Sequence, residues 1–270
     1  LHKVRGEDKK QIIHELKLIE ENISDLLISG KDYILNRSPI VFATHTGFQP
    51  FLLRGQKFDV VLVDEAAQCT EVDLWLTLPW GKRWILAGDP SQLPAVVKSS
   101  KAKELSVSLM ERLIKKDVYY HLLEEQYRMH EKIAQYSSDT FYQSSLIVGH
   151  EDQNKTLEGI DQHDHLFWAI SPHVFIDTAG SESEELLDEY SYYNQHEAQF
   201  IIDRVNELVD AGIKSEQIGV IAPYRAQCDL INKLNTHTGI EIKSIDSFQG
   251  REKDIIFISC VRTNTEQTIG

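Results

Sequence analysis

The sequence predicts an α/β fold with parallel sheets flanked by helices. Short apolar runs of strand length alternate along the chain with longer amphipathic runs of helical length, and polar or acidic residues directly follow several of the apolar runs. This alternation is typical of parallel strands joined by helical crossovers. Two such sheets are implied, and we expect two domains, residues 1–116 and 117–270.

Apolar periodicity predicts the individual elements. Near the N-terminus one stripe of a charged helix is formed by Ile12, Leu16, Ile19, Ile23 and Leu26. We expect this stripe to pack against the first domain, and a short coiled-coil seam is the alternative. Further helices are expected over 105–115, 194–211 and 227–234, and strands over 39–43, 60–63, 84–87, 119–123, 173–176, 218–221 and 255–259.

Size and composition bound the protein class. A chain of 270 residues has room for one large or two ordinary domains, and its hydrophobic share of 41% is that of a soluble globular protein. No apolar run reaches membrane-spanning length and no cleavable leader is apparent, so we expect no membrane partner. The scattered Cys69, Cys228 and Cys260 lack metal-ligand spacing, which favours a reduced intracellular compartment, cytoplasm or nucleus, and disfavours a zinc site.

The net charge of −14 at first argues against a nucleic-acid partner, because phosphate contacts require Lys and Arg. The charge is concentrated, however: residues 156–203 contain eleven acidic residues and neither Lys nor Arg, so the rest of the chain is close to neutral. A single strand can be held through amides, hydroxyls and stacking, which need no basic surface. We expect the acidic cluster at residues 182–189 to be a solvated loop facing away from such a strand.

The run Val60–Val63 ends on Asp64 and Glu65, followed by small residues. A buried parallel strand has this continuous apolar character, and ligands in α/β sheets bind beyond the carboxyl ends of strands. Asp64 is therefore a candidate Mg²⁺ ligand, and Glu65 a candidate for orienting or deprotonating an attacking water. Taken alone, the pattern equally fits a solvated turn, and Glu65 equally fits a helix-start carboxylate that accepts from free amides.

Three further blocks extend this pattern. In order, Asp64–Gln68, Gly88–Pro94, Glu125–His130 and Ser244–Asp254 resemble motifs II, III, IV and V of superfamily 1 helicases. The DEAAQ form of motif II and the QYRMH form of motif IV point to the up-frameshift-like branch, subclass 1B. Within it, three segments are most similar to the immunoglobulin-mu switch-region-binding helicases: Ser106–Leu113, Ser138–Tyr142 and Val174–Gly180.

The resemblance implies two RecA-like P-loop NTPase domains. Residues 1–116 would be the C-terminal part of the first domain with an N-terminal helical segment, and residues 117–270 the second. It further implies an ATP-dependent helicase that uses ATP and Mg²⁺ and moves 5′-to-3′ on single-stranded DNA or RNA. The alternative is an inactive nucleic-acid-binding or interaction remnant of the same fold. No G-x-x-x-x-G-K-[ST] phosphate loop is present, and the sequence ends at Gly270, short of where the family's arginine-rich sixth motif should begin. We therefore expect an interior fragment that lacks the first and sixth motifs. We also expect a monomer.

On the nucleotide side of motifs II and III, the resemblance assigns Mg²⁺ coordination to Asp64 and general-base duty to Glu65. Gln92 can both donate and accept hydrogen bonds, so it suits a sensor of the γ-phosphate, with an ordinary surface glutamine as the alternative. Asp89 is expected to hold the motif III loop in place.

In motif IV, Arg128 is the candidate arginine finger, because a planar guanidinium stabilises charge on a transferring phosphoryl group. Tyr127 is expected to stack on the adenine. The alternative is an ordinary helix start in which Tyr127 and Met129 belong to the core. In motif V, Gly250 would permit close backbone approach to the nucleotide, and Glu252 would accept from the ribose hydroxyls.

For the nucleic acid, Thr44 and Thr46 resemble the hydroxyl-bearing motif that touches strand phosphates in the first domain. Pro223 and Tyr224 resemble the equivalent patch in the second. Hydroxyls and amides that follow strand ends suit backbone contacts, which position a strand without reading its sequence. His45 is expected to be a surface histidine with its hydrogen bonds satisfied.

Overall fold

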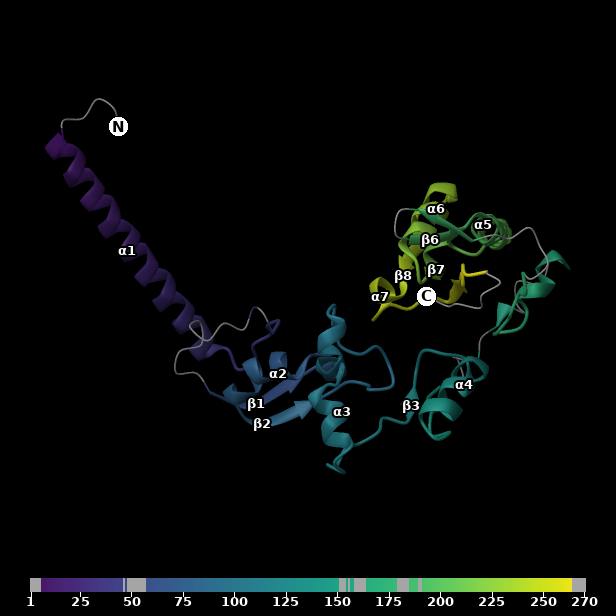
Figure 1. The fold of residues 1–270 in the computed structure, drawn as a ribbon, viewed down its shortest axis with the longest axis horizontal. Coiled ribbons are helices and arrows are strands. Elements are labelled where there is room, and N and C mark those ends of the chain that lie inside the picture. Colours follow the sequence, from purple (N-terminus) through teal and green to yellow (C-terminus); the bar gives the residue numbers. More distant parts are fainter. Residues whose placement is uncertain are drawn as a thin grey trace. The chain divides into compact units, whose positions relative to one another are not determined.

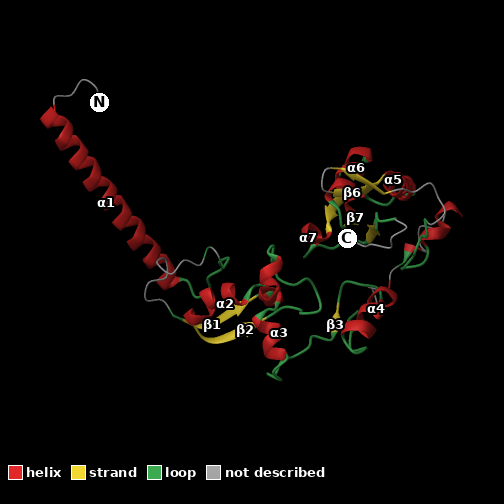
Figure 2. Cartoon of the chain, in the orientation of Figure 1, coloured by secondary structure: helices red, strands yellow, loops and turns green. Residues whose placement is uncertain are grey.

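The computed structural model describes residues 6–45, 47, 57–150, 154, 156–157, 164–178, 185–188 and 191–263. The chain divides into two compact units, Leu1–His121 and Leu122–Gly270 (Figure 1). Helices and strands alternate within both units (Figure 2), which confirms the predicted α/β class.

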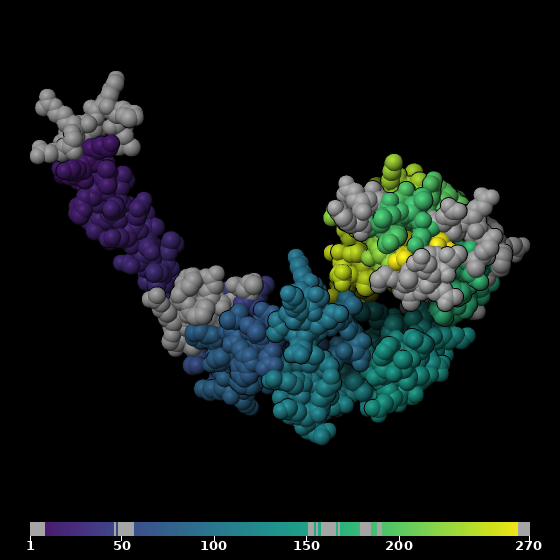
Figure 3. Space-filling model, viewed as in Figure 1, coloured from purple at the N-terminus to yellow at the C-terminus, as the bar shows by residue number. Residues whose placement is uncertain are grey.

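The N-terminal helix α1 runs from Gly6 to Arg37 (Figure 3, purple). The helix was correctly predicted. The prediction that its apolar stripe packs against the first domain is wrong, because Leu16, Ile19 and Ile23 are each about half exposed and Leu26 is 70% exposed. Leu27, Tyr33 and Ile34 continue the stripe at four- and seven-residue steps, whereas Leu18 and Ile28 lie off it, and all five side chains are exposed. The stripe therefore runs along most of α1 and stays largely exposed.

In the first unit, β1 (Phe58–Val63) pairs in parallel with β2 (Gly81–Leu86), and Val63 lies opposite Leu86. Between them come the 3₁₀ turn η2 (Ala66–Gln68), helix α2 (Glu71–Thr77) and the turn η3 (Leu78–Trp80). The buried core is Val63, Ala66, Leu74, Leu78 and Leu109. Each buried Val or Leu side chain of this core contributes about 1.5–3 kcal/mol relative to an exposed one, so the core fixes the carboxyl end of β1.

The helix predicted over 105–115 is shorter than expected. A 3₁₀ segment η4 occupies Ser100–Ser106, and α3 spans Leu109–Ile114. Val107 has an extended backbone, and the Ser108 side chain accepts a hydrogen bond from the amide of Glu111 at 3.1 Å. Ser108 is thus an N-cap residue, which defines where the helix begins.

The second unit holds a parallel sheet in the order β8–β7–β9, formed by Glu241–Ser244, Ile218–Ala222 and Ile255–Ile258. Helices α5 (Gln195–Asp210) and α6 (Arg225–Leu234) supply buried side chains to the same core as β7. These elements confirm the predicted strands and helices of this region. The short helix α7 (Ile245–Phe248) follows β8 directly.

The remaining elements of the second unit are short. They are β3 (Glu125–Gln126) and β4 (Ile147–Val148), which pair in parallel; α4 (Glu131–Phe141); the 3₁₀ segments η7 (Asp164–Ala169) and η8 (Ser215–Gln217); and the antiparallel pair β5 (Glu185–Asp188) and β6 (Ser191–Asn194). The sheets among the described residues are therefore small, with two or three strands each.

Three predicted strands are wrong. Residues 39–43, 119–123 and 173–176 are all described, and none of them pairs with a described strand. Their apolar side chains are exposed, with Phe42 at 93%, Tyr119 at 87% and Phe175 at 81%. An apolar run forms a strand only where a neighbour completes its backbone hydrogen bonds, and these runs have no such neighbour in the described part of the chain. Within that part, none of the helices combines the length and apolar character needed to span a membrane.

Candidate functional site

The carboxyl ends of β1 and β2 bring motifs II and III together. Ala87 N donates to Val63 O at 2.9 Å, and Ala66 N donates to Ala87 O at 2.8 Å, so the chain after β1 is bonded to the chain after β2. Asp64 and Glu65 lie in the first of these segments, and Gln92 follows in the second. The predicted candidates of both motifs thus share one edge of the sheet, as expected for ligand sites in α/β folds.

Glu65 occupies an unusual position. Its backbone is left-handed, with a φ of 52°, at the start of η2. Its side chain makes no cap hydrogen bond; instead Gln68 Nε2 donates to Glu65 Oε2 at 2.8 Å. The helix-cap alternative for Glu65 is therefore not what the structure shows, and the exposed carboxylate is held at the sheet edge by Gln68.

Asp64 fits the chemistry of a magnesium ligand. One oxygen, Oδ1, accepts from the amide of Glu65 at 3.0 Å, which orients the carboxylate, and within the described residues Oδ2 has no donor. Mg²⁺ is usually held by one or two carboxylates together with waters and substrate phosphates. In the described residues no group of three or more His, Cys, Asp or Glu side chains could hold a metal.

Gly88 allows motif III to approach motif II closely. A Cβ atom on this glycine would lie 2.9 Å from both Ala66 N and Ala67 N, closer than real Cβ contacts occur. The neighbouring Asp89 organises the loop: its Oδ1 accepts from Ser91 N at 3.0 Å and its Oδ2 from Gln92 Nε2 at 2.8 Å. The side chain of Gln92 is exposed and held in this way by Asp89.

His45 does not match the prediction of a surface histidine with its hydrogen bonds satisfied. It is half-buried, its Nε2 lies 3.2 Å from Cys69 Sγ, and its Nδ1 is buried without a partner among the described residues. Burial raises the pKa of the Cys69 thiol, and the nearby carboxylates of Asp73 and Glu65 add to this effect. The neighbouring Thr44 is exposed, and its Oγ1 accepts from Gly47 N at 3.0 Å. Thr46 lies outside the described residues.

In the second unit, Gln126 shapes the motif IV turn. Its Oε1 accepts from the amides of Arg128 at 3.0 Å and Met129 at 2.7 Å, and its Nε2 donates to Met129 O at 2.6 Å. This arrangement presents the exposed side chain of Arg128, whose Nε donates to Glu252 Oε2 at 2.8 Å. Candidates from motifs IV and V therefore meet. The sequence did not predict this role of Gln126, because the role depends on its side chain bonding to the backbone of its own turn, which no residue pattern indicates.

Tyr127 is exposed, so the alternative that assigned it to the core is not supported. Its hydroxyl donates to Glu125 Oε2 at 2.6 Å, which raises the pKa of Tyr127 above its ordinary value. A Cβ atom on Gly149 would lie 2.4 Å from the Tyr127 ring, so the ring packs directly on that glycine. His130 behaves as an ordinary helix start, because its Nδ1 accepts from Lys132 N at 3.1 Å.

Gly250 has a φ of +74°, and nothing lies within 4 Å of where its Cβ would be. The backbone here needs glycine for its conformation, and the space beside it is open. The next residue, Arg251, pairs with Glu241 on β8. Gly250 and Glu252 thus flank an arginine that is anchored to the sheet.

Tyr224, at the start of α6, belongs to an aromatic and charged cluster. Its ring packs edge-to-face against Tyr192 with centroids 5.5 Å apart, and Arg262 Nη1 lies 3.5 Å from its hydroxyl. The Arg262 guanidinium lies 4.2 Å above the Tyr192 ring and donates through Nε to Glu185 Oε2 at 2.8 Å. That hydrogen bond raises the pKa of Arg262. The neighbouring Pro223 is exposed.

The acidic cluster was predicted to be a solvated loop, and this is wrong for Glu185 and its neighbours up to Asp188. They form strand β5, and the side chain of Glu185 is only 15% exposed. The reason is its pairing with Arg262, a residue 77 positions away that no local pattern could have connected to it.

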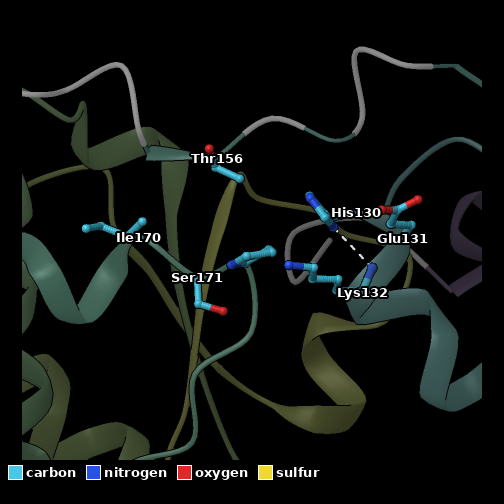
Figure 4. A pocket seen from close by; sticks show the side chains of 7 residues that line it. His130, Glu131, Lys132, Thr156, Ile170 and Ser171 are labelled. Atoms are coloured by element: carbon cyan, nitrogen blue, oxygen red, sulfur yellow. Dashed lines mark hydrogen bonds between the residues drawn. The ribbon is translucent and has the colours of Figure 1, made fainter.

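A pocket of about 520 Å³ also lies in the second unit (Figure 4). Its lining is His130, Glu131, Lys132, Thr156, Ile170, Ser171 and Pro172. Of these described lining residues, only His130 belongs to motifs II to V, and it caps helix α4. The pocket is therefore separate from the predicted nucleotide-binding side chains.

Comparison with known proteins gives this geometry a family. A model described as an AAA domain matches residues 105–270, and a second with the same description matches residues 2–100. The chain is 34% identical over 276 residues to DNA polymerase alpha-associated DNA helicase A of Schizosaccharomyces pombe, covering 98% of this chain and 41% of that protein. It is 37% identical over 280 residues to DNA-binding protein SMUBP-2 of Rattus norvegicus, covering 97% of this chain and 28% of that protein. The chain belongs to the superfamily 1 helicases.

Membership in the superfamily 1 helicases implies the P-loop NTPase α/β fold and confirms the predicted resemblance. Another relative is the Regulator of nonsense transcripts 1 homolog of Drosophila melanogaster, 36% identical over 267 residues, which cover 93% of this chain and 22% of that protein. The chain spans less than half the length of each of these three relatives.

Proposed function

We propose that this chain carries motifs II to V of an ATP-dependent helicase that uses ATP and Mg²⁺ to move 5′-to-3′ along single-stranded DNA or RNA. In this proposal residues 1–116 belong to a first RecA-like domain and residues 117–270 to a second. The observation that carries the proposal is the bonded junction of motifs II and III, which holds Asp64 and Glu65 at the carboxyl end of paired parallel strands.

The proposed roles follow from side-chain chemistry. Asp64 would coordinate Mg²⁺, which supplies charge neutralisation at the phosphates. Glu65 would accept a proton from the attacking water, and Gln92 would sense the γ-phosphate from a loop that Asp89 organises. Each of these groups is exposed at one sheet edge, where a nucleotide could reach it.

The second unit would contribute the remaining nucleotide contacts. Arg128 would act as the arginine finger, Tyr127 would stack on the adenine, and Glu252 would accept from the ribose beside the open backbone of Gly250. The ion pair of Arg128 with Glu252 is exposed on both sides, so exchange of Glu252 for a phosphate costs little.

The nucleic acid would be held by Thr44 and Thr46 from the first unit and by Pro223 and Tyr224 from the second. Exposed hydroxyls and an aromatic ring can bind phosphates and bases without reading sequence. The relatives named for DNA binding and DNA helicase activity support a nucleic-acid substrate.

The test is steady-state ATP hydrolysis by the complete helicase, with and without a single-stranded oligonucleotide, together with unwinding of duplexes that carry a 5′ or a 3′ single-stranded tail. We expect strand-stimulated hydrolysis and unwinding of the 5′-tailed duplex. Asp64→Asn should abolish both, because Mg²⁺ loses its carboxylate. Strand binding without any turnover would instead show a binding remnant that has lost the enzyme activity.

A further inference from the structure

A strained turn follows strand β9. Val261 has a φ of 69° and is fully buried, and Arg262 N donates to Cys260 O at 2.7 Å across it. This hydrogen bond closes a γ-turn with a positive φ at its centre, the rare and strained form. A positive φ at a β-branched residue is a genuine outlier, and such strain persists only where the surroundings impose it.

A partly buried hydrogen-bond network imposes the strain. Glu197 Oε2 accepts from Val261 N at 2.9 Å, and Asn194 Nδ2 donates to Val261 O at 3.2 Å, so both peptide groups of the strained residue are held. The same Glu197 oxygen accepts from Ser259 Oγ at 2.6 Å. Gln227, which is fully buried, donates to Ser259 Oγ at 2.9 Å and accepts from Asn194 N at 2.8 Å. Residues from α5, α6 and the end of β9 are thereby locked together.

The turn determines where the chain goes next. Directly after it, Arg262 reaches Glu185, Tyr192 and Tyr224, and the amide of Thr263 donates to Glu185 Oε2 at 2.7 Å. Without the turn at Val261, β9 would continue extended, and the side chain of Arg262 would leave this cluster.

We infer that Glu197 is a positioning residue that clamps the strained turn at Val261 and so places Arg262 against Tyr192 and Tyr224, at the contact for a single strand. The strand-binding part of this inference rests on the proposed function, which assigns Tyr224 to the nucleic acid. Arg262 orders the two rings because it lies over one and within reach of the hydroxyl of the other. Ordered aromatic rings bind bases with less entropy loss than mobile ones.

The test uses glycine rescue in the full 270-residue chain. Affinity for a fluorescein-labelled 20-nucleotide oligothymidylate, or its oligouridylate counterpart, is measured by anisotropy. Glu197→Ala should weaken binding about five- to tenfold, corresponding to loss of an ordered contact. Adding Val261→Gly should restore affinity to within about twofold, because glycine adopts a positive φ without strain and no longer needs the clamp.

Val261→Ala is the matched control for the rescue. Alanine removes most of the same buried side chain but keeps the penalty for a positive φ, so the double variant with Glu197→Ala should stay weak. If Glu197→Ala weakened binding only through lost packing, the double variant with Val261→Gly would bind no more tightly than the one with Val261→Ala. Equal affinities of the two double variants, or wild-type affinity of Glu197→Ala alone, would overturn the inference.

An NMR signal separates this inference from the proposed function. The Arg262 Nε–H resonance reports the hydrogen bond to Glu185 without any nucleic acid, and it should lose its protection from solvent exchange in Glu197→Ala and regain it with Val261→Gly. An unchanged signal in Glu197→Ala would overturn the clamp. Failure of the wild-type chain to bind either oligonucleotide, with the signal changing as expected, would overturn the strand contact while supporting the clamp.

Discussion

Arg128 and Glu252 are separated by 124 positions in the sequence, yet Arg128 Nε donates to Glu252 Oε2 at 2.8 Å. The two side chains are 58% and 67% exposed, so the pair adds little to stability, at most about 1 kcal/mol. Its importance lies in placement, because it brings together the candidate residues of motifs IV and V. It also leaves Arg128 paired to a carboxylate that a phosphate can replace.

We expect Arg128→Ala in the complete helicase to lower kcat by about 100-fold or more, while single-strand affinity changes less than about twofold. The guanidinium acts on charge that develops only in the transition state, so its loss affects turnover more than binding. ATPase kinetics and strand-binding anisotropy at one salt concentration measure both. Arg112→Ala is the control, since Arg112 also lies in an exposed ion pair, with Glu71. Lost strand affinity with an intact kcat would move Arg128 to the nucleic-acid surface.

Gly88→Ala should lower the free energy of unfolding of the first unit by about 1–3 kcal/mol, because the new Cβ would press on the amides of Ala66 and Ala67. Gly30→Ala is the matched control: it lies in α1 with nothing within 4 Å, so alanine should be neutral or stabilise by up to about 1 kcal/mol. Urea unfolding followed by tryptophan fluorescence measures both. Equal effects of the two substitutions would show that motifs II and III are not tightly joined at Gly88.

The raised pKa of Cys69 predicts a thiol that reacts slowly with alkylating reagents. Alkylation requires the thiolate, and a pKa above the ordinary value leaves less thiolate at any given pH. We expect Cys69 in the native chain to react with iodoacetamide at pH 8 more slowly than in the urea-unfolded chain, and its rate to keep rising as pH increases. Mass spectrometry of the labelled peptides measures this. Fast labelling at pH 7 that His45→Ala abolishes would instead indicate a reactive thiolate paired with His45.

Much of the fold could be predicted where an apolar run pairs with a neighbouring strand or lines one face of a helix. The strands that become β1 and β7 were predicted from their continuous apolar sequence, and α5 because its apolar residues recur at helical steps. Only β7 is buried along most of its length; in β1, Val60 and Leu62 are 39% and 61% exposed, and the strand forms because it pairs with β2. The same reasoning failed at Tyr119 and Phe175. Their runs look alike in sequence, and only the absence of a pairing neighbour among the described residues distinguishes them.

The candidate site could be predicted in part for a related reason. Asp64, Glu65 and Arg128 lie in motifs that can be recognised from the sequence. The features that hold the site in place are either residues far away in the sequence or backbone conformations. From the sequence, Glu185 could not be distinguished from the other acidic residues around it, because its partner Arg262 lies 77 positions away. The strain at Val261 is a property of the backbone that no residue pattern displays. Sequence identifies candidate reacting groups more readily than the groups that position them.

The 270-residue chain alone should bind ATP weakly. It contains no phosphate-loop sequence, so the successive amides and the lysine that cradle the β- and γ-phosphates are missing, and only the candidate Mg²⁺ and base side remains. Isothermal titration of Mg²⁺–ATP should show no binding in the micromolar range. Micromolar affinity that Asp64→Asn removes would show that these residues form a sufficient nucleotide site by themselves.

Glu65→Gln in the complete helicase should preserve ATP affinity and lose nearly all strand-stimulated hydrolysis, about 100-fold or more. The amide keeps the shape of the side chain and an oxygen that can accept from Gln68, so the left-handed segment at the end of β1 stays in place. What it cannot do is take a proton from water. Glu104→Gln, an exposed glutamate in η4, controls for the charge change alone. Single-turnover hydrolysis and nucleotide titration measure the two effects separately. Near-normal turnover in Glu65→Gln would remove the base assignment, and lost ATP affinity would show that Glu65 serves in binding instead.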